Sequence, residues 1–374
     1  MVDLKAQYEK LKPEIDEAVS KVINSASFIK GPEVLKFEDE LREYLGARHV
    51  VSCANGTDAL QIAMMALDLK PGDEVITTDF TFISTVEVIA FMGLKPVLVD
   101  PDAVSYNISV EAIRNAITPK TKAIVPVHLF GQCANMEEII NIANENNLYV
   151  IEDAAQATGA EYRFSNGTIN RAGTMGRIGT TSFFPSKNLG CYGDGGAIIT
   201  WDHYLANQMR SIANHGMKVK YYHDDIGINS RLDTIQAAIL SVKLRHLDNF
   251  NNARARVASY YDEALQSCQS VELPGRSSFS SHIFHQYTIR VKNGKRNELK
   301  EFLNANNVPS MIYYPVPMHL QKAYKYLGYK EGDLPVTEAL SKEVLSLPIC
   351  PETDEQQLNH ITSCILNFFN GHDK

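Results

Sequence analysis

The chain has 374 residues, 44% hydrophobic and 21% charged, which suffices for one large or two moderate domains without metal or disulfide support. Lys and Arg total 36 against 44 Asp and Glu, a formal charge of −8, and this argues against a nucleic-acid-binding surface. No apolar run approaches the roughly 20 residues of a membrane span, and the charged start Met1–Lys5 is unlike a secretory signal. We therefore expect a soluble, cytoplasmic protein that binds neither nucleic acid nor membranes.

Six cysteines are scattered through the chain without C-x-x-C pairs or the spacing of zinc ligands. They are Cys53, Cys133, Cys191, Cys268, Cys350 and Cys364. The cytosol keeps such thiols reduced, so we expect no disulfides. The run His223–Asp225 has residue types that bind metals, but adjacent side chains point apart and no spaced third ligand is evident. We expect no metal site.

Up to residue 152, segments with helical spacing of apolar residues alternate with short apolar segments typical of strands. Helices are expected at residues 11–24, 33–45, 58–67, 83–92, 109–117 and 136–146. Strands are expected at residues 50–53, 73–77, 96–99, 121–127 and 149–152. This alternation predicts an α/β fold in which a mostly parallel sheet lies between helices.

The pattern changes after about residue 230. Residues 232–265 have the apolar spacing of one or two long helices, and residues 282–292 alternate as a half-buried antiparallel strand does. A helix at 297–306, a strand at 308–314 and a terminal helix at 354–369 complete the expected order. We predict a large domain of residues 1–245 and a smaller C-terminal α+β domain of residues 246–374.

In a parallel α/β sheet, ligands bind at the carboxyl ends of the strands. The segment Cys53–Asp58 joins a strand to a helix there. Gly56 allows a ligand to approach the backbone, and the free amides of the helix start, with the Thr57 hydroxyl, suit an anion. A plain helix cap is the alternative. The segment Asp79–Phe82 follows another strand and offers an aromatic face, although such side chains more often belong to a core.

Two further segments carry a carboxylate and a lysine. Glu152–Gln156 ends the most apolar strand, where a carboxylate is costly unless a cation or a hydrogen-bond donor meets it. A protonated pyridine nitrogen is such a cation, and an Asp that caps the next helix is the alternative. Lys187 lies between an aromatic-rich strand and a glycine-rich turn. Burial there would favour loss of its proton, which suits Schiff-base chemistry, whereas a solvent-exposed amine is the ordinary alternative.

Together the four segments offer a phosphate cradle, an aromatic plate, an acid for a pyridinium and a lysine that can bond an aldehyde. These are the parts of a pyridoxal 5′-phosphate (PLP) site. The glycines after Lys187 do not fit G-x-G-x-x-G and follow no first strand of a βαβ unit, so we reject a dinucleotide fingerprint. We therefore expect a PLP enzyme.

Four longer motifs contain these parts. They are Ser52–Leu60 (SCANGTDAL), Glu152–Gln156 (EDAAQ), Ser182–Lys187 (SFFPSK) and Asn229–Asp233 (NSRLD). With them, the sequence resembles nearly end to end the DegT/DnrJ/EryC1/StrS nucleotide-sugar aminotransferases, PLP enzymes of the aspartate-aminotransferase fold (fold type I). The motifs are most similar to those of bacterial enzymes that aminate C3 of a UDP-linked 3-keto-N-acetylglucosaminuronic acid.

The resemblance implies roles around the cofactor ring. Lys187 would be the catalytic lysine, which bonds the cofactor and then moves the proton between cofactor and substrate carbon. Asp153 would pair with the pyridine nitrogen and keep it protonated. Gln156 would reach the side of the ring that bears the 3-oxygen, and Phe82 would stack on the ring.

The resemblance also implies how the phosphate is held. The amides of Gly56 and Thr57, with the Ser182 hydroxyl, would bind it. Asn229 would reach the phosphate of the neighbouring subunit's cofactor. A homodimer with shared active sites is therefore implied.

The expected substrates are L-glutamate as amino donor and a nucleotide-linked keto sugar as acceptor, for the synthesis of a surface polysaccharide or glycan. Tyr314 and His319 are the expected substrate contacts. Many relatives have histidine where this chain has Tyr313, and residues 162–178 form a longer stretch whose Asn166-Gly167 suggests a hairpin. The departure at Tyr313 leaves open a dTDP- or UDP-linked 3-keto sugar or 4-keto-6-deoxy sugar, whereas the longer stretch is equally compatible with a tolerated surface excursion.

Two other functions are weighed against the aminotransferase. PLP-dependent sugar dehydratases of this fold carry histidine at the position of Lys187, so the intact lysine disfavours them. A non-catalytic regulatory or binding homologue would not need the complete set of cofactor residues, and no basic helix-turn-helix segment is evident. The aminotransferase is the expected function.

Overall fold

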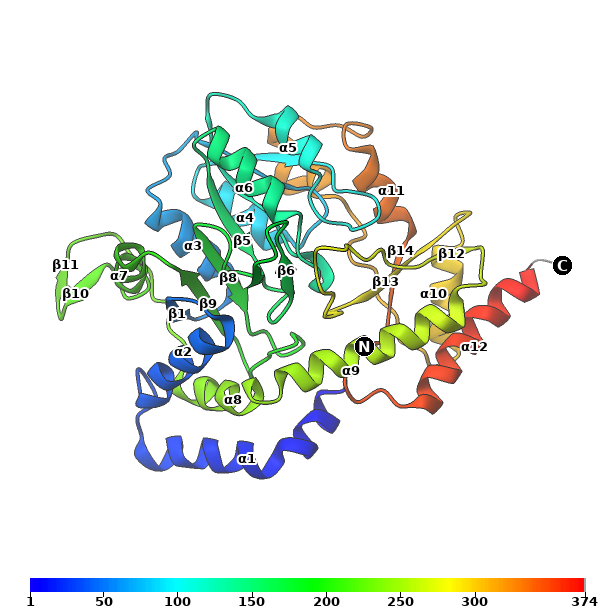
Figure 1. Cartoon of the computed structure of the whole chain (residues 1–374), viewed down its shortest axis with the longest axis horizontal. Coiled ribbons are helices and arrows are strands. Elements are labelled where there is room, and N and C mark those ends of the chain that lie inside the picture. Colours follow the sequence, from blue (N-terminus) through cyan, green and yellow to red (C-terminus); the bar gives the residue numbers. More distant parts are fainter. Residues whose placement is uncertain (373–374) are drawn as a thin grey trace.

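The computed structural model describes residues 1–372. Its central feature is a seven-stranded sheet (Figure 1). In sheet order the strands are β1 (His49–Cys53), β9 (Gly196–Thr200), β8 (Ile178–Ser182), β5 (Tyr149–Asp153), β4 (Thr121–Val125), β2 (Glu74–Thr78) and β3 (Lys95–Val99). Strand β9 is antiparallel to β1 and β8, whereas the other neighbouring pairs are parallel. The predicted α/β fold with a mostly parallel sheet is confirmed.

Both faces of the sheet are buried under helices. Helices α3 (Gly56–Ala66), α4 (Ile83–Phe91) and α7 (His203–Ile212) pack on one face, and α5 (Val110–Ala116) and α6 (Met136–Glu145) pack on the other. Because successive strand residues point to opposite faces, Val75 and Ile151 belong to the first core, while their neighbours Ile76 and Val150 belong to the second. This two-sided burial explains why the strands have the near-continuous apolar sequences of a parallel sheet.

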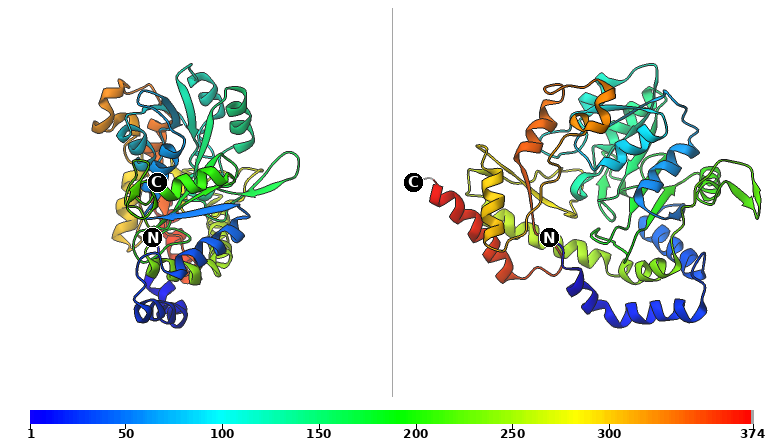
Figure 2. Two further views of the ribbon diagram at one scale, coloured as in Figure 1. Left: turned by 90° about the vertical axis from the view of Figure 1, so that its left-hand side faces the viewer. Right: turned by 180° about the vertical axis from the view of Figure 1, so that it is seen from behind.

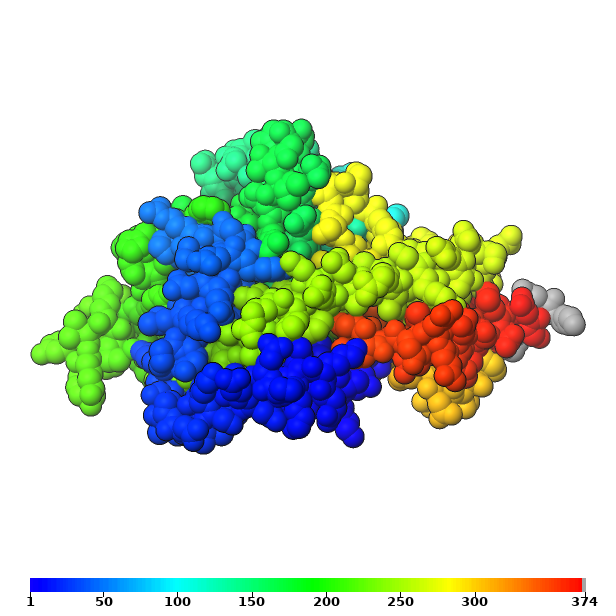
Figure 3. All heavy atoms as spheres, turned by 60° about the horizontal axis from the view of Figure 1, so that its bottom comes forward, coloured from blue at the N-terminus to red at the C-terminus, as the bar shows by residue number. Residues whose placement is uncertain are grey.

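The two N-terminal helices pack against α8 (Thr234–Leu244), and the second of them also contacts strand β1. Asp3 caps α1 (Leu4–Ser25) by accepting a hydrogen bond from the amide of Ala6, and α2 (Pro32–Leu45) begins with proline, whose fixed φ suits a first turn. Leu11 of α1 packs with Ile239 of α8 in a small core cluster. In Figure 3, α1 (dark blue) lies alongside α8 (yellow-green).

The C-terminal part is built on α9 (Leu247–Leu265) and a three-stranded antiparallel sheet of β12 (Val271–Glu272), β13 (Tyr287–Val291) and β14 (Val344–Leu347). Helices α10 (Arg296–Ala305), α11 (Pro335–Glu343) and α12 (Glu355–His372) complete it. A separate core joins α9, β13, β14, α10 and α12. The break between α8 and α9 falls at the predicted boundary near residue 245, and the division into domains 1–245 and 246–374 stays a proposal.

Two expected strands differ from the structure. The strand predicted at 308–314 is absent, and only Met311 forms a single bridge there, to Ser346; Pro309 in this segment lacks the amide that a ladder needs. The strand predicted at 282–292 is shorter, since β13 begins at Tyr287.

Two hairpins lie outside the main sheets. The one predicted near Asn166-Gly167 is confirmed as β6 (Glu161–Arg163) paired with β7 (Ile169–Arg171). The second, β10 (Met217–Val219) with β11 (Tyr222–His223), projects from the body of the molecule (Figure 2). Within residues 1–372, every helix is too short or too polar to cross a bilayer.

Candidate active site

A cavity of about 750 Å³ opens where the predicted segments meet. Eight of the predicted site residues line it: Gly56, Thr57, Phe82, Asp153, Gln156, Ser182, Lys187 and Tyr314. They come from the first turn of α3, the loop after β2, the end of β5 with the turn that follows it, the end of β8 with the loop that follows it, and the segment before η2 (Met318–Leu320). Five separate parts of the chain therefore place their functional groups around one space at the carboxyl edge of the sheet.

Lys187 is half-buried in the wall of this cavity. Burial disfavours its charged form and lowers its pKa to about 8, while the nearby Asp153 carboxylate acts in the opposite direction. The local turn is fixed by the amide of Lys187, which donates to the carbonyl of Phe184 at 2.8 Å. An amine with this pKa is neutral often enough near pH 7 to act as a nucleophile and a proton carrier.

Asp153 and Glu152 are adjacent in β5 and point to opposite faces. Asp153 is 5% exposed and faces the cavity, where Thr85 Oγ1 donates to its Oδ2 at 2.7 Å and the amide of Ala155 to its Oδ1 at 3.1 Å. No helix begins directly after β5, so Asp153 does not cap one. Its carboxylate remains available for a cationic group in the cavity.

Glu152 is fully buried on the other side of the strand. Its carboxylate accepts hydrogen bonds from the amides of Gly173, Met175 and Gly176 at 2.8, 2.6 and 2.6 Å. His128 Nε2 lies 2.8 Å from the same carboxylate, and His128 Nδ1 accepts from an amide, so the ring proton is on Nε2. Glu152 therefore stabilises the turn before β8 and has no place in the cavity.

The start of α3 forms an anion cradle. Asn55 Oδ1 caps the helix by accepting from the amide of Asp58 at 2.8 Å. A Cβ placed on Gly56 would lie 2.7 Å from Ser182 Cβ, so only glycine lets these two segments approach each other. The helix amides and the Ser182 hydroxyl meet at this point, which is the geometry that binds a phosphate.

Aromatic side chains form one wall of the cavity. Phe82 is 54% exposed despite its size, and its ring centre lies 6.4 Å from that of Tyr314. Gln156 Oε1 accepts from the amide of Phe130 at 2.8 Å, and Gln156 Nε2 donates to the Tyr314 hydroxyl at 3.1 Å. Burial raises the pKa of Tyr314, so its hydroxyl keeps its proton.

These features fit PLP. The cradle at Gly56 suits the phosphate, the partly open Asp153 carboxylate suits a protonated ring nitrogen, and the exposed face of Phe82 suits an aromatic ring. Lys187 has the lowered pKa that bonding to an aldehyde requires.

Two predicted residues lie outside the cavity. His319 is 1% exposed and lies between two carboxylates: Nδ1 is 2.7 Å from Asp79 Oδ2 and Nε2 is 3.2 Å from Glu338 Oε1. The expected substrate contact at His319 is therefore corrected, because both ring nitrogens are already used. Asn229 is exposed, and its backbone forms a bridge with Asn214 away from this chain's own cavity.

Sequence reasoning missed His285 and Gln286, which also line the cavity. They lie just before β13 and are 6% and 7% exposed. The alternation of residues 282–292 placed them on opposite faces of a strand, but the chain enters β13 only at Tyr287. Two adjacent polar residues between Ile283-Phe284 and Tyr287 are the signal that could have identified them.

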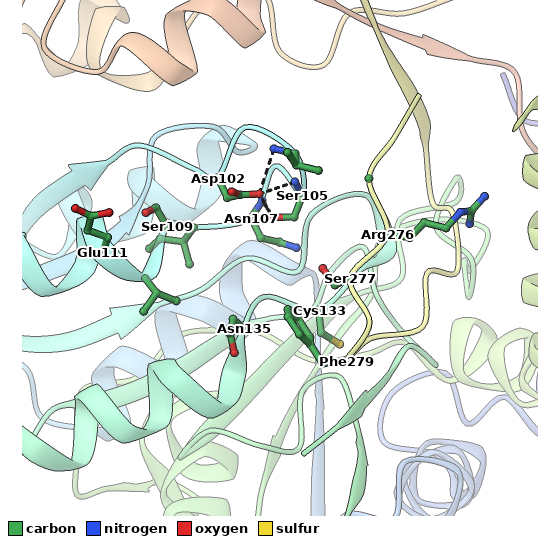
Figure 4. Close-up of a pocket in the computed structure, with 14 residues that line it drawn as sticks. Asp102, Ser105, Asn107, Ser109, Glu111, Cys133, Asn135, Arg276, Ser277 and Phe279 are labelled. Atoms are coloured by element: carbon green, nitrogen blue, oxygen red, sulfur yellow. Dashed lines mark hydrogen bonds between the residues drawn. The ribbon is translucent and has the colours of Figure 1, made fainter. Parts of the chain in front are cut away.

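A second cavity, of about 380 Å³, lies between residues 102–111 and residues 275–279 (Figure 4). Its polar side chains serve the local fold. Asp102 Oδ1 accepts from the amide and hydroxyl of Ser105 at 2.7 and 2.8 Å, and Asn107 Nδ2 donates to a carbonyl at 3.1 Å. Arg276 points away from the other labelled side chains and pairs with Asp262. We assign no ligand to this cavity.

Comparisons with known proteins agree with this site. Residues 9–366 match the DegT/DnrJ/EryC1/StrS aminotransferase family. The chain is 50% identical to the "pleiotropic regulatory protein" of Geobacillus stearothermophilus over 99% of this chain and 98% of that protein. It is 43% identical to the UDP-2-acetamido-2-deoxy-3-oxo-D-glucuronate aminotransferase of Pseudomonas aeruginosa (98% and 99%) and to the UDP-N-acetyl-3-dehydro-alpha-D-glucosamine 3-aminotransferase of Acidithiobacillus ferrooxidans (99% and 98%).

Solved structures extend the likeness to the whole fold. DesV of S. venezuelae, in complex with a ketimine intermediate, superposes with a TM-score of 0.94 at 39% identity, covering 98% of this chain and 97% of that chain. NtdA of Bacillus subtilis, with bound cofactor PMP, gives 0.88 at 33% identity, covering 96% and 82%. The resemblance read from the sequence motifs is confirmed: the chain belongs to the DegT/DnrJ/EryC1/StrS family of PLP-dependent sugar aminotransferases.

Proposed function

We propose that this aminotransferase moves the amino group of L-glutamate to C3 of a UDP-linked 3-keto-N-acetylhexosamine, with the glucosaminuronic acid as the first choice. The observation that carries this proposal is the 43% identity, over nearly the whole chain, to two relatives whose names specify UDP-linked N-acetylated 3-keto sugars. A dTDP- or UDP-linked 3-keto or 4-keto-6-deoxy sugar is the alternative acceptor. The product would enter the synthesis of a surface polysaccharide or glycan.

The cavity residues support a division of labour. PLP, when bound, supplies an aldehyde and an electron-withdrawing ring. Asp153 would hold the ring nitrogen in its protonated form, and Gly56 with Ser182 would bind the phosphate. Lys187 would move a proton to and from the substrate carbon, because its pKa of about 8 lets it both take and release a proton near neutral pH.

The test supplies PLP-loaded enzyme with L-glutamate and, in parallel, the UDP-3-keto-N-acetylglucosaminuronic acid, its non-oxidised hexosamine counterpart and a dTDP-3-keto-6-deoxy sugar. Mass spectrometry and NMR then identify the aminated carbon. The proposal expects the highest kcat/KM for the uronic acid, with amination at C3, and no product from Lys187→Ala. Preference for the dTDP sugar, or amination at C4, would overturn it.

We further propose that a homodimer is the active unit and that Asn229 completes the partner's site. Large apolar side chains near this residue are exposed: Phe28 is 45%, Ile29 is 49% and Ile226 is 87% exposed. The segment of Phe28 and Ile29 adjoins the Asn229 segment, because Thr234 N donates to Phe28 O at 3.0 Å and Ile29 bridges to Asp233. A patch of this kind marks an interface, and a second copy is the occupant that also explains why Asn229 lies outside its own cavity.

Mixing two inactive variants tests the shared site. Lys187→Ala and Asn229→Asp should each be inactive as homodimers, the second because added negative charge repels a phosphate. In a heterodimer, one site collects both substitutions and the other has neither. Co-refolded equal mixtures should therefore recover about a quarter of wild-type activity by random pairing of subunits. Recovery of none, with dimers verified by light scattering, would contradict a shared site.

Two further points complete the proposal. Cys53, Cys133, Cys191, Cys350 and Cys364 form no disulfide among the described residues, which suits a cytoplasmic location. The regulatory name of the 50% identical relative makes a non-catalytic role the second candidate. Purified protein that stays colourless after PLP is added would favour that role, whereas a visible absorbance band that L-glutamate bleaches in wild type but not in Lys187→Ala supports the enzyme.

A further inference from the structure

His285 is a buried polar residue that none of the proposed roles uses. It is 6% exposed, lies just before β13 and lines the same cavity as Lys187. Its position is fixed through its backbone, because the guanidinium of the fully buried Arg254 contacts the carbonyls of Phe284 and His285 at 3.2 and 3.4 Å. A rigidly mounted imidazole in the reaction cavity is suited to contact a reactant.

The two ring nitrogens have different surroundings. Nδ1 is enclosed and has no hydrogen-bond partner among the described residues. Nε2 is not among the enclosed atoms and makes no hydrogen bond to residues 1–372 either, so it is the nitrogen left for the cavity. A buried N–H donor without a hydrogen-bond acceptor is rarer in proteins, and destabilises them more, than a buried acceptor atom without a donor. The ring proton is therefore assigned to Nε2, where a ligand can meet it.

The surroundings also settle the charge of the ring. Burial lowers the pKa of His285 well below its ordinary value, and the positive charges of Lys187 and Arg254 lower it further. The imidazole is thus uncharged across the neutral range. An uncharged ring with its proton on Nε2 is a hydrogen-bond donor that does not titrate during turnover.

An aminotransferase needs such a donor at one particular atom. As the acceptor sugar reacts, its carbon gains a C–N bond, its C=O bond breaks and the oxygen leaves as water with the two protons that the amine nitrogen gives up. As the donor reacts, its C–N bond breaks and water supplies the keto oxygen of 2-oxoglutarate. When the amine attacks the carbonyl, and when the oxygen leaves, negative charge develops on the oxygen. The donor half passes through transition states of the same kind in reverse, so a fixed N–H directed at that oxygen stabilises the transition states of both halves.

We propose that His285 is a catalytic residue that donates a hydrogen bond from Nε2 to the oxygen entering or leaving the reacting carbon. The ring keeps its proton throughout, so no net proton transfer is assigned to it, and Lys187 remains the group that moves protons on carbon. This inference rests on the aminotransferase activity of the family and holds for any of the candidate sugars.

The first test reads the ring directly. In ¹⁵N-labelled protein, the imidazole signals absent from His285→Gln are assigned to His285 and followed from pH 6 to 8.5 with and without PLP. We expect an uncharged ring with the proton on Nε2 throughout. A ring that titrates in this range, or that carries its proton on Nδ1, overturns the proposal whatever the enzyme's activity.

The second test separates the step that involves the oxygen on the reacting carbon from the step that does not. When PLP-loaded enzyme meets L-glutamate, the donor nitrogen first displaces Lys187, a step without a carbonyl oxygen, and 2-oxoglutarate is released later with uptake of water. Stopped-flow absorbance resolves the two phases. His285→Phe should slow only the second phase, by about 10²–10³-fold, as for the loss of one such hydrogen-bond donor. His285→Gln restores an N–H donor and should recover much of the lost rate of that phase.

An isotope effect distinguishes this role from help to Lys187. With α-deuterated L-glutamate, His285→Phe should show a smaller isotope effect than wild type, because the step on oxygen becomes rate-limiting. A larger effect would place His285 in proton transfer at carbon and overturn the proposal, as would equal slowing of both phases.

His282→Phe is the matched control. His282 lies in the same segment with its pKa lowered by burial to about 3, but it stacks on Phe284 and does not line the cavity. It should leave both phases unchanged. If wild-type enzyme shows no response to L-glutamate at all, the aminotransferase assignment fails, while the NMR result still decides the state of the ring.

Discussion

Thr85 and Asp153 are joined by a hydrogen bond of 2.7 Å between Oγ1 and Oδ2, although they lie on different elements of the fold. Thr85 is in the first turn of α4 and Asp153 is the last residue of β5. Both are buried. The hydroxyl holds the carboxylate in one orientation, so the position of the acid in the cavity depends on a helix that contributes no residue of its own to the predicted chemistry.

Thr85→Val should weaken PLP binding by about tenfold, because it removes one hydrogen bond to a charged group while keeping the shape of the side chain. Asp153→Asn should weaken it more and should also reduce kcat. Equilibrium dialysis and the cofactor absorbance band measure both. Thr81→Val is the matched control: Thr81 is 1% exposed and its hydroxyl has no partner among residues 1–372, so its loss should leave PLP binding unchanged.

Lys187→Met should stabilise the cofactor-free protein at neutral pH. The folded pKa of about 8 lies below the ordinary 10.5, because burial disfavours the charged amine. Below pH 8 the amine is charged in both states, and the full cost of burying that charge destabilises the fold. Between pH 8 and 10.5 the folded state releases a proton that the unfolded state keeps, and the cost disappears as the pH rises through 10.5. We expect a gain of about 1–3 kcal/mol in the free energy of unfolding near pH 7, using about 1.4 kcal/mol per pKa unit and a discount for solvent.

Urea unfolding at pH 7 and at pH 10 measures the difference. The advantage of Lys187→Met over wild type should shrink at the higher pH. An advantage of the same size at both values would show that the substitution acts through packing and not through charge.

His319→Gln should destabilise the fold by about 3 kcal/mol, because it leaves two buried carboxylates without their shared cation. Burial opposes the charge on His319, but the hydrogen bonds and charges of Asp79 and then Glu338 outweigh it and raise the pKa above 6.5. The stabilisation is therefore complete below pH 6.5 and is lost as the pH rises through the raised value. Thermal unfolding from pH 6 to 9 should show that the difference in Tm between His319→Gln and wild type becomes smaller as the pH rises.

Glu152→Gln should cost about 3–5 kcal/mol, because a buried carboxylate that accepts from three amides and a histidine is replaced by a group that also brings two N–H donors. Glu301→Gln, on the exposed face of α10, should change stability by less than about 0.5 kcal/mol. Guanidinium unfolding compares the two. A small effect at Glu152 would mean that the turn before β8 does not depend on this carboxylate.

Local patterns identified much of the fold and the cofactor side of the site. The βαβ rhythm and the turn motifs depend on neighbouring residues, so Gly56, Asp153 and Lys187 could be assigned to strand ends directly. Strand β9 was not expected as an antiparallel member of the main sheet, because strand direction is decided by pairing between distant segments. The family resemblance already assigned Asp153 to the site, and only the structure shows that the adjacent Glu152 lies on the opposite face of β5, outside the cavity.

The substrate side of the site was less accessible to sequence reasoning. His319 has the residue type of a ligand contact, yet it is occupied by Asp79 and Glu338, residues far from it in the chain. His285 and Gln286 looked like part of a regular strand, and only the later start of β13 turns both toward the cavity. These placements depend on how the C-terminal segments pack on the sheet.

Asn55 lines one side of the cavity and Tyr314 lines another. The ribosome therefore synthesises the first side early in translation and the second side late. A chain released before residue 314 would contain Lys187 and Asp153 and could still form the central sheet, but it would lack the wall that carries Tyr314. Retention of the cofactor would then mark a polypeptide that is both full-length and folded, and bound PLP would protect finished molecules preferentially over incomplete ones during their time in the cell.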